Sequence, residues 1–196
     1  MNSAAIILAA GFSSRMGSDK ALLELGGMSA LERLVTTFQA AGIARIYLVA
    51  GNNHEALQQL DLPVLLLHNP QPEAGMFSSV RIGSLHLAEE VEAFFVQPVD
   101  CPLVSPETLH RLQEALQQQG ADAVVPCCGA IKGHPPLLRA SLRARIADYQ
   151  RDDGLRGLLT VCTTALVAVP DQGVLLGMNR PEQYQQLCRY LAEQTV

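Results

Sequence analysis

Residues 5–20 read AIILAAGFSSRMGSDK, an apolar run that opens directly into a loop rich in glycine and serine. Residues 5–10 carry no charge and are too few to span a membrane, so they predict a buried strand. Small loop residues let backbone N–H groups approach a phosphate closely and form an anion-binding nest. The stretch therefore predicts a strand that ends at a phosphate-binding loop.

The same order of apolar run, turn and periodic helix recurs along the chain. We expect strands at residues 5–10, 46–49, 64–67, 93–97, 123–125 and 166–169. We expect helices at residues 29–41, 54–60, 78–87, 106–120, 142–149 and 181–193. Ser29 and Glu32 predict a capping box, and beyond residue 125 the pattern is less regular. Alternating strands and helices predict an α/β fold with a mainly parallel sheet, whose ligands bind outside the carboxyl ends of the strands.

Length, composition and charge limit the classes of function. The 196 residues fit one domain, residues 1–196, and 48% hydrophobic residues suffice for a sizeable core. A formal net charge of −5 argues against a nucleic-acid partner. The five cysteines are odd in number and show no C-x-x-C spacing, so we expect reduced thiols and a cytoplasmic protein with no membrane partner.

Polar residues of the first loop carry the chemistry expected there. Arg15 is suited to forked contacts with phosphate oxygens, and Lys20 supplies a mobile point charge. The loop matches neither the Rossmann G-x-G-x-x-G nor the P-loop G-x-x-x-x-G-K-[ST]. The alternative is an ordinary strand-to-helix loop with a surface arginine and lysine.

Asp100 follows the predicted strand at residues 93–97, so its carboxylate is expected at that strand's carboxyl end. Mg²⁺ needs only one or two protein oxygens beside those of a bound phosphate. The pattern therefore predicts a magnesium ligand, and the alternative is a turn aspartate before a helix.

The first loop resembles the signature of nucleotidyltransferases with a Rossmann-like, three-layer, glycosyltransferase-A-like fold. It is most similar to the MobA-like enzymes that join a nucleotide to molybdopterin, which are CTP:molybdopterin cytidylyltransferase and its guanylyl relative. Matching stretches follow in the same order at residues 69–83, 98–103, 133–135 and 153–159. The resemblance implies catalytic roles for Arg15, Lys20 and Asp100. It implies nucleotide contacts from Leu8, Ala9, Ala10, Gly11, Ser13, Ser14, Arg15, Lys20, Gly75, Ser78 and Ser79.

The resemblance also implies a second metal ligand, Asn179, beside Asp100. The cytidylyl enzymes more often read D-x-D-T-P-E where this chain reads GMNRPE at residues 177–182, which removes two carboxylates. Asn179 as a cap of the last helix is the alternative. Arg81, near the predicted helix start, is interpreted either as added charge for the nucleotide or as a solvated helix residue.

On the acceptor side the resemblance implies His134, Asp153 and Arg156. His134 stands in a G-H-P element, and residues 152–156 resemble a G-D-x-G-x-R element in which Asp152 replaces the glycine. A structural role is the alternative for His134.

The resemblance implies transfer of CMP from CTP to the terminal phosphate of molybdopterin, with Mg²⁺ as cofactor, release of pyrophosphate and delivery to an apo-molybdoenzyme. Ala10 favours CTP, while Asp19 before Lys20 resembles the GTP-dependent enzymes. The alternatives are GTP as donor, another phosphate acceptor such as a sugar phosphate, and a non-catalytic carrier of nucleotide or pterin.

Overall fold

The computed structural model describes residues 1–11 and 19–194. Within them an eight-stranded sheet has the order β3-β2-β1-β4-β7-β5-β6, and β8 also pairs with β5. The strands are β1 (Ser3–Ala9), β2 (Arg45–Ala50), β3 (Leu65–His68), β4 (Ala93–Pro98), β5 (Ala123–Cys128), β6 (Ile131–Lys132), β7 (Leu137–Arg139) and β8 (Thr164–Ala168). Each strand predicted from the sequence is present, with its bounds shifted by a few residues at most.

The predicted mainly parallel sheet is confirmed. Strands β1 to β4 pair in parallel, and β8 runs parallel to β5. The short strands β6 and β7 are antiparallel to their neighbours and were not expected. Two or three residues are too few to show a period of two, and their pairing depends on β4 and β5, which lie elsewhere in the sequence.

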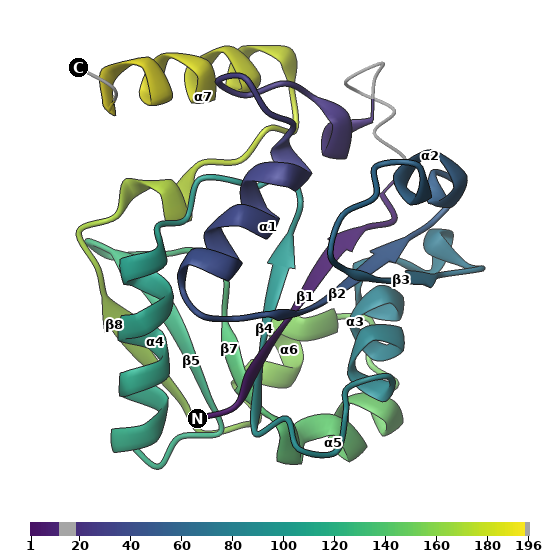
Figure 1. Ribbon diagram of the computed structural model, residues 1–196. Coiled ribbons are helices and arrows are strands. Elements are labelled where there is room, and N and C mark those ends of the chain that lie inside the picture. The colour runs from purple at the N-terminus through teal and green to yellow at the C-terminus, as the bar shows by residue number, and fades with distance from the viewer. Residues whose placement is uncertain (12–18, 195–196) are drawn as a thin grey trace.

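Helices cover both faces of the sheet (Figure 1). They are α1 (Ala30–Ala40), α2 (His54–Gln58), α3 (Met76–Leu85), α4 (Pro106–Gln118), α5 (Arg143–Asp148), α6 (Gly154–Thr160) and α7 (Pro181–Gln194). Short 3-10 helices are η1 (Lys20–Leu22), η2 (Pro72–Ala74), η3 (Ala140–Leu142) and η4 (Gln172–Leu175). The capping box of Ser29 and Glu32 is confirmed. Helix α6 was not predicted, and α3 begins before residue 78 because Gly75, at φ 88°, makes its turn directly before Met76.

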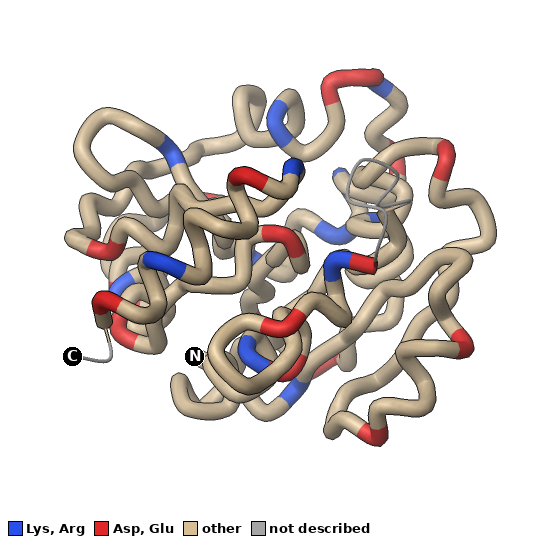
Figure 2. Tube along the Cα trace, turned by 90° about the horizontal axis from the view of Figure 1, so that it is seen from above, with Lys and Arg blue, Asp and Glu red and all other residues tan. Residues whose placement is uncertain are grey.

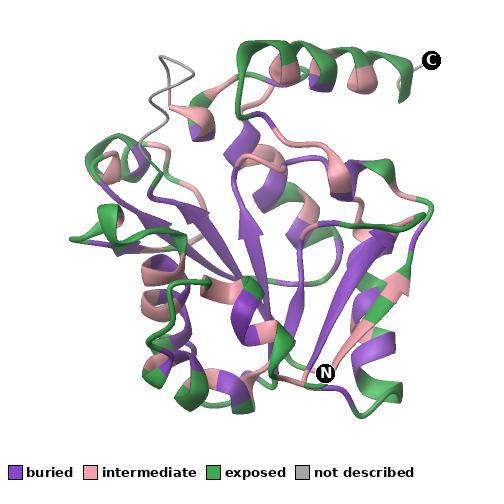
Figure 3. Cartoon of the chain, turned by 180° about the vertical axis from the view of Figure 1, so that it is seen from behind, coloured by how far each residue is buried: buried purple, intermediate pink, exposed green. Residues whose placement is uncertain are grey.

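The central strand β1 is buried on both faces, as expected for a parallel sheet between two helical layers (Figure 3). Ala5 and Ile7 belong to the hydrophobic cluster that includes residues of α1 and α4. Ala4 and Ile6 belong to the cluster that includes residues of α3, α5 and α6. A fully buried Ile, Leu or Phe contributes roughly 1.5–3 kcal/mol, so the core fixes β1 firmly and with it the position of the loop that follows.

The carboxyl ends of β1, β2 and β4 meet at one edge of the sheet, the upper edge in Figure 1, and α7 lies above it. A third hydrophobic cluster, formed by Leu25, Ala30, Leu103, Met178 and Leu187, packs the end of the chain against this edge. Residues from both ends of the sequence therefore come together there. None of the helices in the described ranges has the length and apolar character needed to cross a membrane.

Candidate active site

The site begins where β1 and β4 end side by side. Leu8 is paired with Pro98, and the Val99 N–H donates to the Leu8 carbonyl at 3.0 Å. Asp100 follows immediately and therefore stands beside the end of β1. This is the position that the sequence predicted for it.

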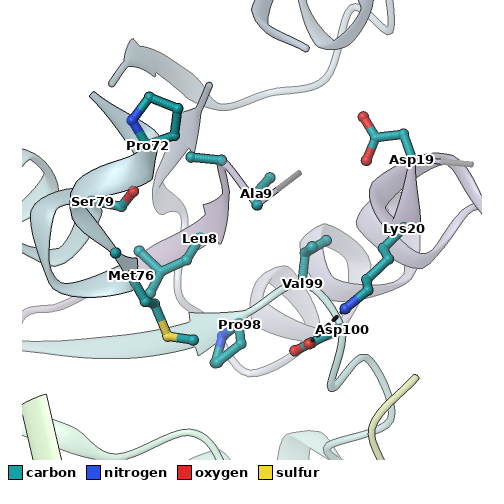
Figure 4. A pocket seen from close by; sticks show the side chains of 13 residues that line it. Leu8, Ala9, Asp19, Lys20, Pro72, Met76, Ser79, Pro98, Val99 and Asp100 are labelled. Carbon is teal, nitrogen blue, oxygen red and sulfur yellow. Dashed lines mark hydrogen bonds and ion pairs between the residues drawn. The ribbon is translucent and has the colours of Figure 1, made fainter. Parts of the chain in front are cut away.

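Lys20 brings three distant segments together. Its Nζ lies 3.2 Å from Asp100 Oδ2 and 2.6 Å from Asn179 Oδ1. The side chains of Lys20 and Asp100 are only 16% and 20% exposed, so their attraction is less screened by water than that of a surface pair. Figure 4 shows the Lys20 ammonium directed at the Asp100 carboxylate in the lining of the pocket.

Asn179 is held at this place by its neighbours. The Met178 N–H donates to the Asp100 carbonyl at 2.9 Å, and the Asn179 N–H donates to Gln183 Oε1 at 2.8 Å. Its side-chain oxygen accepts from Lys20. The residue is therefore tied to Asp100 and Lys20 as well as standing just before α7.

Cys101 supports the same carboxylate. Its Sγ lies 3.6 Å from Asp100 Oδ1. Burial, with the Asp100 charge, raises the pKa of the Cys101 thiol far above its usual range, so the thiol stays protonated and donates. Asp100 thus receives contacts on both oxygens.

A pocket of about 140 Å³ lies at the junction of β1, β4 and α3. Its lining contains most of the predicted nucleotide residues, namely Leu8, Ala9, Ala10, Gly11, Lys20, Gly75 and Ser79, together with Asp100. We call it the nucleotide pocket. The predicted residues Ser13, Ser14 and Arg15 lie outside the described residues.

Asn69 was missed by the sequence analysis and organises the start of α3. It is 1% exposed, and its Nδ2 donates to Ser78 Oγ at 2.8 Å and Ser79 Oγ at 2.9 Å. Ser78 Oγ in turn donates to the Gly75 carbonyl at 2.8 Å. Ser78 does not line the nucleotide pocket but the larger cavity beside it.

The larger cavity, of about 1430 Å³, extends from Pro98 and Gly75 towards α5 and α6. We call it the acceptor cavity. Its lining unites the predicted acceptor residues His134, Asp153 and Arg156. Gly75, Met76 and Pro98 line both spaces, so the two are contiguous.

His134 lines the acceptor cavity but not the nucleotide pocket. Its backbone N–H donates to the Val174 carbonyl at 2.9 Å, while its Nδ1 is buried with no hydrogen-bond partner in the described part of the chain. Burial lowers the pKa of His134, and the charge of Asp100 opposes this only in part. The ring is therefore neutral near pH 7.

The remaining acceptor-side residues behave differently from one another. Asp153 accepts from the Tyr149 hydroxyl at 2.7 Å and pairs with Arg151 at 3.2 Å. It is therefore partly engaged in holding the wall of the cavity. Arg156 and Asp152 line the cavity as well.

Arg81 is partly buried and lines the acceptor cavity, which excludes its interpretation as a solvated helix residue. Its guanidinium donates to the carbonyl oxygens of Tyr149 at 2.6 Å and Ile146 at 3.4 Å, and it lies 5.4 Å from the centre of the Phe77 ring. It satisfies carbonyl groups at the end of α5, so it joins α3 to α5 in the cavity wall, and its contribution of charge to the nucleotide stays a prediction.

The site contains the donors that Mg²⁺ prefers. Among residues 1–11 and 19–194, no three His, Cys, Asp or Glu side chains gather into a metal-binding group. Mg²⁺ needs fewer protein ligands, because water and phosphate oxygens complete its shell. The Asp100 carboxylate and the Asn179 amide oxygen already flank one cation, the Lys20 ammonium, so the residues present fit Mg²⁺.

Charge elsewhere is spread out. Figure 2, which looks onto the edge that bears the site, shows basic and acidic segments interspersed over the molecule. The cationic character expected for phosphate binding is therefore local, as the net charge of −5 requires.

Comparison with known proteins agrees with this fold. Rv0371c from Mycobacterium tuberculosis H37Rv has a similar structure, with a TM-score of 0.81 at 22% identity over 95% of this chain and 97% of that one. Two proteins named molybdenum cofactor guanylyltransferase are similar in sequence. That of Xanthomonas euvesicatoria pv. vesicatoria is 29% identical over 93% of this chain and 92% of its own length. That of Shewanella amazonensis is 28% identical over 96% and 97%.

The fold and these relatives define the class of protein, which is a nucleotidyltransferase. The chain belongs to the family of MobA-like NTP transferase domains, whose model matches residues 5–169. Asp100 and Lys20 lie within the matched range, and Asn179 lies beyond it.

Proposed function

We propose that this nucleotidyltransferase joins a nucleotide to the terminal phosphate of molybdopterin and releases pyrophosphate, for delivery to an apo-molybdoenzyme. The observation that carries the proposal is the meeting of Lys20, Asp100 and Asn179 at the nucleotide pocket, which is contiguous with the acceptor cavity. The names of its relatives support molybdopterin as the acceptor.

In the reaction, an oxygen of the acceptor phosphate forms a bond to the α-phosphorus of the nucleotide. The bond from that phosphorus to the bridging oxygen breaks, and pyrophosphate leaves with the electron pair. An anionic nucleophile needs little deprotonation, so positioning and charge neutralisation suffice. Lys20, with Arg15, binds the triphosphate and neutralises the leaving group.

Asp100 and Asn179 are proposed to hold Mg²⁺. When bound, the ion supplies positive charge to phosphate oxygens and orients them. Neutral His134 faces the acceptor cavity, where its ring suits a flat heteroaromatic pterin better than a polyphosphate. Arg156 supplies charge for the anionic part of the acceptor.

GTP is the proposed donor. The two relatives described above are both named guanylyltransferases, and they favour guanine over the cytosine expected from the sequence. The CTP prediction is not confirmed. It stays the second candidate because Ala10, which lines the nucleotide pocket, favours the cytidylyl enzymes.

The test measures pyrophosphate release with Mg²⁺ and each of the four ribonucleoside triphosphates, with and without molybdopterin. We expect release with GTP that requires molybdopterin. If molybdopterin-dependent release occurred with CTP and with none of the other three triphosphates, CTP would be the donor. Triphosphate binding without release in the presence of molybdopterin would instead indicate another acceptor or a carrier, and a screen of sugar phosphates would separate these.

A further inference from the structure

Asn53 occupies the turn between β2 and α2, and its carboxamide links three segments of the chain. Its Nδ2 donates to the Ala9 carbonyl at 3.0 Å and to Asp19 Oδ2 at 2.6 Å. Its Oδ1 accepts from the Gly51 N–H at 3.1 Å. Although Asn53 precedes α2, it makes no side-chain capping bond to that helix. Its Nδ2 is committed to the end of β1 and to the residue before η1, and its Oδ1 to its own turn.

We infer that Asn53 is a positioning residue for the triphosphate end of the site, acting through Asp19 on Lys20. This inference rests on the proposed function, because it assigns the part that Asn53 plays in nucleotide binding. Asp19 and Lys20 line the nucleotide pocket, whereas Asn53 does not. Its effect on a bound nucleotide is therefore indirect.

The connection from Asn53 to Lys20 is short and fully hydrogen-bonded. Asp19 uses one carboxylate oxygen to accept from the Ala21 N–H at 3.0 Å and the other to accept from Asn53. The first of these bonds caps η1, whose first residue is Lys20. Fixing the Asp19 carboxylate therefore fixes the direction in which Lys20 leaves the backbone, towards Asp100 and Asn179.

An amide is the group that this place requires. The three contacts need two donors and one acceptor, and the Asn53 carboxamide supplies both kinds of atom at once. An aspartate in its place would set a carboxylate against both Asp19 and the Ala9 carbonyl. An alanine would leave the part-buried Asp19 oxygen and Ala9 carbonyl without this donor, which is costly.

The experiment compares Asn53→Ala with Asn52→Ala, because Asn52 is the adjacent asparagine and is exposed. Steady-state pyrophosphate release is measured as a function of the triphosphate and of molybdopterin, beside calorimetric titration with Mg²⁺ and triphosphate. For Asn53→Ala we expect kcat/KM for the triphosphate to fall about tenfold, with the KM for molybdopterin unchanged. Asn52→Ala should behave as the wild-type protein.

An exchange of partners tests the link through Asp19. Asn53→Asp should lose more than Asn53→Ala, because two carboxylates then oppose each other. The double variant Asp19→Asn with Asn53→Asp should have a kcat/KM at least about threefold higher than Asn53→Asp alone. The amide introduced at position 19 can donate to the carboxylate introduced at position 53. In the wild-type background Asp19→Asn should lower kcat/KM. A general loss of stability does not predict this reversal of sign, and thermal unfolding identifies any variant that is not folded.

The outcomes separate the two claims. If the wild-type protein releases pyrophosphate but Asn53→Ala matches Asn52→Ala, the role of Asn53 is wrong and the proposed function stands. If Asp19→Asn deepens the loss in the Asn53→Asp protein, the link through Asp19 is wrong. A wild-type protein that neither binds a triphosphate nor releases pyrophosphate would overturn both claims.

Discussion

At the scale of single residues, the Lys20 ammonium stands where a metal ion would find its protein ligands. It contacts Asp100 Oδ2 and Asn179 Oδ1, the two oxygens proposed to hold Mg²⁺. Two cations sharing these partners repel each other, by about 1–4 kcal/mol at contact distances for effective dielectric constants between water and a protein surface. If Asp100 and Asn179 bind Mg²⁺ as proposed, we expect Lys20 to compete with the ion until a triphosphate offers it another partner.

This competition predicts opposite effects of Lys20→Met on two ligands. Without nucleotide, Mn²⁺ used in place of Mg²⁺ should bind about tenfold more tightly to the variant, because the competing charge is gone. Triphosphate binding in the presence of Mg²⁺ should weaken. Titration followed by electron paramagnetic resonance measures the first effect and calorimetry the second. Weaker Mn²⁺ binding by a folded Lys20→Met protein would contradict the proposed competition.

Asp100 carries the charge in this group, which leads to the prediction for Asp100→Asn. The change keeps the size of the side chain and removes its charge, so turnover should fall at least about a hundredfold, as on removal of one preorganised electrostatic group. Thermal unfolding should change little. Glu55→Gln, which neutralises an exposed carboxylate on α2, serves as the control. Near-normal turnover of Asp100→Asn at saturating Mg²⁺ would rule out the metal assignment.

Residue chemistry in the sequence was enough to single out Lys20 and Asp100 but not to show that they touch. They are 80 positions apart, and Lys20 and Asn179 are 159 apart. Their meeting depends on the pairing of β1 with β4 and on the packing of α7. Asn53 and Asn69 were not predicted as site residues for a related reason. An asparagine in a turn commonly hydrogen-bonds to nearby backbone groups, and its distant partners depend on the fold.

At the scale of elements, the long periodic segments were predictable and the short ones were not. The helices α1 and α4 each have an apolar face and a side-chain cap that can be read locally. Strands β6 and β7 and helix α6 have between two and seven residues. They form against elements already in place, so tertiary contacts rather than local pattern decide them. Two of these segments, β6 and α6, contribute to the wall of the acceptor cavity.

Arg81 shows how one side chain joins two of these elements. It extends from α3 to the carbonyl groups at the end of α5. Arg81→Met should therefore lower the free energy of unfolding by about 1.5–3 kcal/mol, the contribution of hydrogen bonds to a charged group. Affinity for the triphosphate should stay unchanged, because Arg81 does not line the nucleotide pocket.

The matched control is Arg111→Met on α4. Arg111 pairs with Glu107 four positions earlier, with both side chains largely exposed, and such pairs contribute about 0–1 kcal/mol. Chemical denaturation of both variants measures the difference. If the two variants were equally stable, the hydrogen bonds from Arg81 to α5 would contribute no more than a surface ion pair. If Arg81→Met bound the triphosphate more weakly, Arg81 would have a role in nucleotide binding.

At the scale of the whole molecule, two contiguous spaces meet at the end of β4 and the start of α3. The nucleotide pocket lies over the ends of β1 and β4, and the acceptor cavity extends towards α5 and α6. Asp100 lines the first and His134 the second, yet Asp100 is close enough to affect the pKa of His134. Under the proposed function, this arrangement would bring the two substrates together while different residues bind each one.

The division of labour gives the last prediction. His134→Ala should raise the KM for molybdopterin about tenfold, because it removes a ring that lines the acceptor cavity and that we propose contacts the pterin. Binding of Mg²⁺ and triphosphate without acceptor should stay within about twofold, because His134 does not line the nucleotide pocket. His86→Ala, a change at an exposed histidine after α3, should alter neither quantity.

Lys20→Met should show the reverse pattern, with weak triphosphate binding and little effect on the KM for molybdopterin. Steady-state kinetics in molybdopterin, beside calorimetry with the triphosphate, measures both. If folded His134→Ala protein no longer bound the triphosphate, the two spaces would not act as separate sites, and the path of the acceptor to the α-phosphorus would have to run elsewhere.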